Sequence, residues 1–144
     1  MDLTLHRGQW MPLLPESVRM VVIMALPVEA IMRAYDYLTP DIDETAVSLS
    51  VVERMMPLGV WGVLCAIVGV VTLWGLAWRW PRTAITGLRL GAATYAVLAA
   101  GQWIAVVENP WLDGIRGPGM ASIFAFAYFG MALGYVRQQR LGQV

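Results

Sequence analysis

The chain has 144 residues, of which 58% are hydrophobic, and its ten acidic side chains balance ten arginines to give zero formal net charge. A mean hydropathy of +0.60 exceeds what a soluble domain of this length can bury, so lipid is the expected solvent. The balanced charge lacks the basic surplus that nucleic-acid binding requires, so no nucleic-acid partner is expected. The single cysteine, Cys65, excludes an intramolecular disulfide, and we interpret it as an apolar packing residue.

The N-terminal part of the chain predicts an irregular segment, 1–15, followed by an amphipathic helix over 16–38 with a kink at Pro27. The longest uncharged run of this helix, Met20–Val28, is far shorter than the roughly 20 residues that a membrane span prefers. Two placements are therefore open. The helix lies at the membrane interface, which we favour, or it crosses as a fourth span with its charges turned inward.

Glu29 and Arg33 are the charged residues of this helix for which two different roles are open. Their spacing of four, with the acid first, favours a salt bridge on a helix face that sees water or headgroups, and this is our main interpretation. The alternative is that Glu29 is the buried acid of a small proton-coupled transporter, which exchanges a proton for a cation.

An acidic loop, 39–50, follows and is expected to face water outside the membrane. Its three acids lack the glycine and the distal glutamate of a calcium-binding loop, so no metal is expected there. Ser50 and Glu53 fit a capping box, which predicts that the next helix begins near Val51.

Three apolar runs predict transmembrane helices at about 55–78, 90–107 and 118–136, within a helical membrane domain of 51–140. The stretch 80–89, which contains a proline and arginines, is expected to connect the first two spans. Arginines gather at one end of these runs, so the positive-inside rule predicts a cytoplasmic C-terminus. The expected fold class is an all-α integral membrane protein with three transmembrane helices and the N-terminal amphipathic helix as a candidate fourth.

Small side chains recur at spacings of three and four in the first and third runs, which is typical of closely packed membrane helices. Gln102, the amide inside the second run, is expected to hydrogen-bond across helices or to lie at the outer interface beside Trp103, with a pore-lining role as the alternative. The predicted helix-packing residues are Gly59, Gly62, Ala66, Gly69, Ala127, Gly130 and Gly134.

The stretch VVERMMPLGVWG at Val51–Gly62, followed by arginine-flanked spans and a short arginine-bearing tail, resembles the small multi-span membrane proteins of actinobacterial phages and prophages. These proteins are often called holin-like. The resemblance covers about residues 48–140 and transfers no site residue. It implies a phage-linked protein of a bacterial inner membrane.

The sequence contains none of the motifs of catalysis within a membrane, such as H-E-x-x-H or a bis-histidine haem site, and it has a single histidine. We therefore expect neither an enzyme nor a cofactor. The leading hypothesis is a homo-oligomeric inner-membrane protein that acts in membrane permeabilisation or phage exclusion, with the lipid bilayer as its surroundings and its glycine faces driving self-association. The alternatives are the transporter that uses Glu29 and an assembly protein whose N-terminal helix recruits a protein partner.

Overall fold

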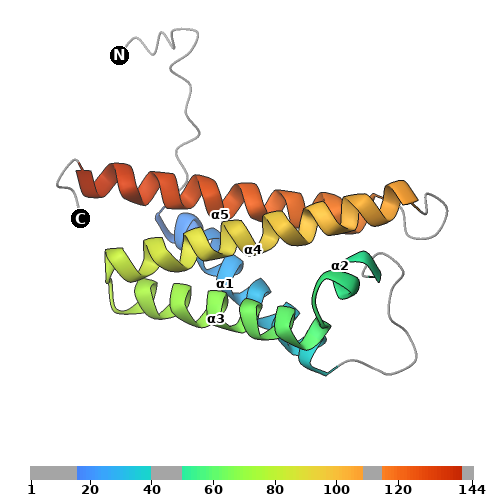
Figure 1. Ribbon diagram of the computed structural model, residues 1–144. Helices are drawn as coiled ribbons and strands as arrows, with labels where there is room; N and C mark the ends of the chain where they lie inside the picture. Colours follow the sequence, from blue (N-terminus) through green and yellow to red (C-terminus); the bar gives the residue numbers. More distant parts are fainter. Residues whose placement is uncertain (1–15, 40–49, 109–114, 141–144) are drawn as a thin grey trace, which may run out of the picture.

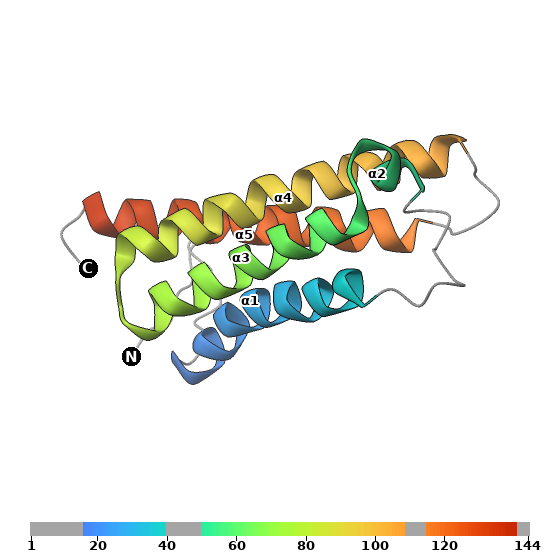
Figure 2. The same cartoon turned by 60° about the horizontal axis from the view of Figure 1, so that its bottom comes forward.

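The computed structural model describes residues 16–39, 50–108 and 115–140, and within these ranges the regular structure is entirely helical. Long helices lie side by side, and one short helix packs near one end of them (Figures 1 and 2). The helices are α1 (Glu16–Leu38), α2 (Ser50–Met55), α3 (Leu58–Ala77), α4 (Pro81–Glu108) and α5 (Arg116–Arg140). Of these, α3, α4 and α5 are long and apolar enough to cross a membrane.

Prolines set the starts of α3 and α4. Pro57 lies directly before α3, and the helical stretch expected from Val51 onward is divided there into α2 and α3. Pro81 is the first residue of α4, where its missing N–H costs no helical hydrogen bond. The prediction of a connector over 80–89 was therefore wrong, because the chain is helical from Pro81 on.

A tight turn joins α3 to α4 and makes them antiparallel. The Trp80 N–H donates to the Gly75 carbonyl at 2.8 Å, and the Arg79 N–H donates to the Leu76 carbonyl at 3.3 Å, which is the hydrogen-bond pattern of a Schellman motif. Arg79 occupies the left-handed position of this motif with a φ of 53°, where glycine is usual. The turn thus reverses the chain within three residues.

Glycines of α3 allow α1 to pack closely along it. A Cβ at Gly62 would meet the side chain of Leu38, whereas one at Gly69 would lie 2.6 Å from Ile31 Cγ1 and 2.9 Å from the Pro27 carbonyl oxygen. Contacts therefore move towards the start of α1 as they move towards the end of α3. The two helices run antiparallel, and Figure 2 shows them side by side.

The short helix α2 packs on α4. Val52 is 1% exposed and lies against Gly101, while the indole N–H of Trp61 donates to the Val52 carbonyl at 3.3 Å. These contacts place α2 over the end of the bundle where α3 begins. One core cluster contains Leu26, Ala30, Val68, Leu88, Tyr95, Tyr128 and Ala132, and a second contains Ala34, Tyr37, Val52, Trp61, Cys65 and Leu98.

Candidate functional site: a polar cluster inside the bundle

One stripe of α1 carries three polar side chains into the bundle. Glu29, Arg33 and Tyr37 are spaced four residues apart, so they follow one another along the same side of the helix. Ala30 and Ala34 lie beside this stripe and are 0% and 4% exposed. Their small side chains let the neighbouring helices approach the α1 backbone, and the longer polar side chains reach into the space between helices.

The expected ion pair between Glu29 and Arg33 is present. Arg33 Nε and Nη2 both donate to Glu29 Oε1, at 2.9 and 2.6 Å, and Arg33 Nη1 donates to the Tyr37 hydroxyl at 3.3 Å. The side chains of Arg33 and Glu29 are only 21% and 22% exposed. The pair is thus less exposed than the expected face towards water or headgroups, since most of its surface is covered by the bundle.

Tyr95 of α4 supplies a further hydrogen bond to the Glu29 carboxylate. Its hydroxyl donates to Glu29 Oε2, so both carboxylate oxygens accept hydrogen bonds. The guanidinium carbon of Arg33 lies 5.4 Å from the centroid of the Tyr95 ring, which adds a cation–π contact. Tyr95 is 0% exposed. Tyr95 is not among the predicted site residues, although a tyrosine inside an apolar run is itself a signal, since a buried phenol requires a hydrogen-bond partner.

Tyr128 brings α5 into the same cluster. Its ring stacks on that of Tyr95, with centroids 5.3 Å apart, and its hydroxyl donates to the Leu26 carbonyl at 2.8 Å. Tyr128 is also 0% exposed. The cluster therefore links α1 to both α4 and α5 through polar contacts, in a part of the bundle that is otherwise apolar.

The chemistry of this polar cluster is that of one compensated ion pair. A charge inside an apolar bundle costs free energy unless it is paired and hydrogen-bonded, and here both charges are. Protonation of Glu29 would remove the negative charge that holds Arg33 and Tyr95. Within 16–39, 50–108 and 115–140, no three His, Cys, Asp or Glu side chains gather as a metal site would require.

Gln102 of α4 is buried against the start of α5. Its side chain is 4% exposed, and in the part of the chain that the structure describes its Oε1 atom has no hydrogen-bond partner. A Cβ at Gly117, near the start of α5, would lie 3.5 Å from this oxygen, and glycine offers no side-chain donor. The oxygen faces the N-terminal end of α5, where the helix dipole is favourable for it. An interhelical hydrogen bond to this oxygen is therefore absent among the described residues, and the expected bond across helices stays a prediction for the amide nitrogen.

The predicted packing residues divide into two groups. Gly62 and Gly69 lie against α1, and Ala66 between them is partly buried. By contrast, a Cβ added at Gly130 or Gly134 of α5 would have no heavy atom of the described chain within 4 Å. The same is true of Gly59, while Ala127 is partly buried.

The irregular segment 1–15 and most of the acidic loop 39–50 lie outside the described residues. In three comparisons with known proteins, no family model, no curated protein and no solved structure matches this chain.

Proposed function

We propose that this protein spans a bacterial inner membrane as a bundle of four helices, with α1 as the fourth span, and self-associates there to permeabilise the membrane or to exclude other phages. Two observations support the placement of α1. It packs lengthwise along α3, which is itself long enough to span. Its charged pair is turned towards Tyr95 of α4 rather than away from the bundle, as membrane-spanning segments with ionisable residues require.

The arginines support one orientation of this bundle. Those of the α3–α4 turn, of the first turns of α4 and of the end of α5 lie at the same end, which by the positive-inside rule faces the cytoplasm. Trp74 and Trp78, stacked with centroids 3.9 Å apart and both exposed, lie at this end as an interfacial belt. The cytoplasmic arginines are Arg79, Arg82, Arg89, Arg137 and Arg140.

The observation that carries the proposal of self-association is the outward face of α5. Gly130 and Gly134 are four residues apart and exposed, and no described atom lies near the positions of their missing Cβ atoms. In membranes such a glycine pair lets two helix backbones approach closely. The glycines of α3 that face α1 are already used within the subunit, whereas this pair is open to a second copy.

A permeation path in this proposal runs between subunits. The middle of each bundle is filled by large side chains that are 0% exposed, including Tyr95, Tyr128, Leu88 and Leu98. Close-packed interiors of this kind leave little room for water. Self-association is therefore the step on which permeabilisation depends.

Disulfide cross-linking tests self-association directly. In a Cys65→Ala background, cysteine at position 134 is expected to give a covalent dimer on mild oxidation in liposomes, because two copies meet at the Gly130–Gly134 face. Cysteine at Val70, an exposed position on α3, is the matched control and should give little dimer. Equal cross-linking at the two positions would contradict the proposed interface.

Dye release tests permeabilisation. Liposomes of phosphatidylethanolamine and phosphatidylglycerol that contain the protein should release calcein. The release rate should rise more than linearly with protein density, because several subunits are needed to form one permeation path. Gly130→Leu with Gly134→Leu should abolish most of this leakage, and Val70→Leu should leave it unchanged. Intact vesicles at high protein density would contradict permeabilisation and leave phage exclusion as the function. Phage exclusion is tested by infecting a host that carries the double substitution, which should lose its protection against other phages.

A second candidate function is the small proton-coupled transporter. The observation that favours it is that Glu29 lies among four helices with Arg33 and Tyr95 bonded to separate carboxylate oxygens. In this function, Glu29 takes up a proton, which releases Arg33 and Tyr95 from the carboxylate, and a cation that then binds the carboxylate displaces that proton. Glu29→Gln is expected to abolish substrate-driven proton release from proteoliposomes, while Asp36→Asn, an exposed acid on the same helix, should not. Unchanged transport in Glu29→Gln would dispose of this candidate.

A further inference from the structure

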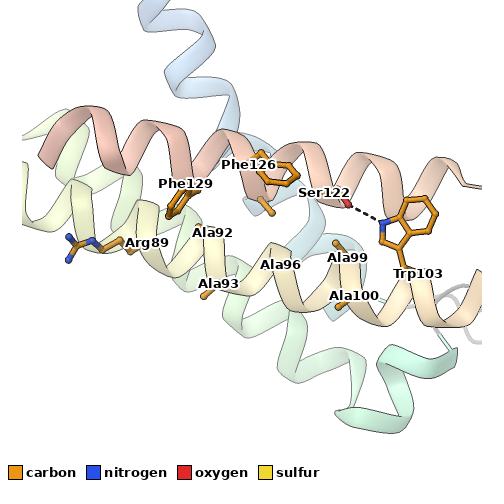
Figure 3. Close-up of a pocket in the computed structure, with 11 residues that line it drawn as sticks. Arg89, Ala92, Ala93, Ala96, Ala99, Ala100, Trp103, Ser122, Phe126 and Phe129 are labelled. Atoms are coloured by element: carbon orange, nitrogen blue, oxygen red, sulfur yellow. Dashed lines mark hydrogen bonds between the residues drawn. The ribbon is translucent and has the colours of Figure 1, made fainter. Parts of the chain in front are cut away.

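An open apolar groove of about 770 Å³ runs between α4 and α5 (Figure 3). Its floor is formed by the methyl groups of alanines on α4, and Phe126 and Phe129 of α5 stand beside it. Neither Gly130 nor Gly134 lines this groove, although Phe126 lies one helical turn before Gly130, so the groove adjoins the proposed interface between subunits. The alanines are Ala92, Ala93, Ala96, Ala99 and Ala100, with Ala125 on α5.

The two ends of the groove differ in chemistry. At one end the indole N–H of Trp103 donates to the Ser122 hydroxyl at 3.1 Å, and that hydroxyl donates to the Pro118 carbonyl at 2.8 Å. These bonds join α4 to α5 and satisfy the polar atoms there. At the other end lies the exposed cationic side chain of Arg89 (Figure 3). The groove is therefore apolar along its length and positively charged at one end only.

The length of the groove matches an extended acyl chain. Arg89 and Trp103 are 14 positions apart on one helix, which corresponds to about 21 Å at 1.5 Å per residue. In the orientation proposed above, Arg89 lies at the cytoplasmic side, and the groove descends from it through much of the roughly 30 Å hydrocarbon core. The Arg89 backbone lies inward of Trp74, since Gly87 lies against Thr72, and its long side chain extends from there towards the lipid phosphates. A guanidinium binds such phosphates with two parallel hydrogen bonds.

We infer that this groove binds one acyl chain of an anionic phospholipid from the cytoplasmic leaflet, with the lipid phosphate at Arg89. The inference rests on the proposed membrane placement but not on self-association. Charge complementarity identifies the occupant. The negative headgroup of an anionic phospholipid meets the positive end of the groove at Arg89, and its acyl chain then lies along the apolar alanines. Such basic sites between transmembrane helices on the cytoplasmic side recognise anionic headgroups.

Native mass spectrometry of the full chain in detergent tests the charge preference. Delipidated protein is titrated with phosphatidylglycerol or phosphatidylcholine that carry the same acyl chains. The wild type is expected to retain phosphatidylglycerol preferentially, and Arg89→Gln is expected to weaken that binding by about tenfold. Binding of phosphatidylcholine, whose choline cation offsets its phosphate, should fall by less. Arg82→Gln is the matched control, since Arg82 is an exposed arginine on the same helix that does not line the groove, and it should keep the preference.

A second pair of variants tests the groove itself. Ala96→Phe fills the floor and is expected to remove binding of both lipids, whereas Val97→Phe, at an exposed neighbouring position outside the groove, should not. Equal retention of the two lipids by the wild type would overturn the inference. Glycerol phosphate competing as well as phosphatidylglycerol would mean a simple phosphate site, and would also overturn it. Loss of a dimer in Ala96→Phe with lipid binding intact would assign the groove to a second copy instead.

Discussion

At the scale of single residues, the decisive feature is a charged pair held inside an apolar bundle. Glu29 and Arg33 neutralise each other within one helix, and Tyr95 supplies the remaining hydrogen bond from α4. An ion pair of this kind contributes little net stability over apolar packing, but removal of one partner leaves the other charge uncompensated. The pair therefore fixes which face of α1 meets α4.

Substitution of Arg33 by Met tests this asymmetry. The variant should lose about 2–3 kcal/mol of unfolding free energy, because the Glu29 carboxyl would be left without its partner in a mostly buried position. The double variant with Glu29→Gln should recover most of the loss. Denaturant titration in detergent micelles measures both values, with Asp36→Asn as an exposed control on the same helix. A double variant less stable than Arg33→Met would contradict the explanation.

At the scale of elements, glycines determine how closely α3 approaches its neighbours. Gly69 touches the backbone of α1 at Pro27, and Gly75 lies against the first residues of α4. A side chain at either position would have to displace backbone atoms rather than flexible side-chain ends. The turn between α3 and α4 adds a further local cost, because Arg79 adopts a left-handed conformation that favours glycine.

Gly69→Ala is expected to destabilise the protein by about 1–3 kcal/mol, since its Cβ would force α1 away from α3. Gly59→Ala on the same helix meets nothing within 4 Å among the described residues, so its stability should be unchanged or slightly higher. The difference between the two thermal midpoints is the measurement. Equal midpoints would mean that α1 does not dock on α3 through Gly69.

Arg79→Gly is expected to raise the unfolding free energy by about 1 kcal/mol through relief of the left-handed backbone. Because this change also removes a charge, Arg79→Ala is the control that removes the charge and keeps the strain. Chemical denaturation of the two variants should separate them, with the glycine variant more stable. The reverse order would show that the turn is not strained at this residue.

At the scale of the whole molecule, the arrangement of α1 decides the topology. A helix that packs antiparallel along α3 has its start at the same end as the α3–α4 turn. If α1 spans, as we propose, the N-terminus lies with the cytoplasmic arginines. If α1 instead lies flat at the interface, as the sequence alone favours, the N-terminus is outside.

Cysteine labelling distinguishes these topologies. With Cys65 replaced by Ala, a cysteine at position 2 or 6 should be protected from a membrane-impermeant maleimide in intact spheroplasts and should react after lysis. A cysteine at position 41, in the acidic loop, should react in intact spheroplasts and serves as the positive control. Reaction of position 2 without lysis would place α1 outside the membrane and exclude Glu29 from any transmembrane pathway.

Much of the fold is predictable from the sequence, whereas less of the site is. Hydropathy predicts α3, α4 and α5 because apolar length is a property of each segment by itself. The four-residue spacing of Glu29 and Arg33 likewise predicts their ion pair. The helical start at Pro81 was missed because arginines outside the hydrocarbon region do not mark the end of a helix.

The sequence by itself determined the class of the protein, the apolar segments and the end at which its arginines gather, since these follow from local composition. Only the tertiary structure decided which face of each helix meets another. Tyr95 and Glu29 are 66 positions apart, and Tyr128 and Leu26 are 102 apart, so no local pattern predicts their contacts. The same applies to the glycines, because Gly62 and Gly69 of α3 are enclosed whereas Gly130 and Gly134 of α5 are open, and the difference lies in which neighbouring helix packs beside them.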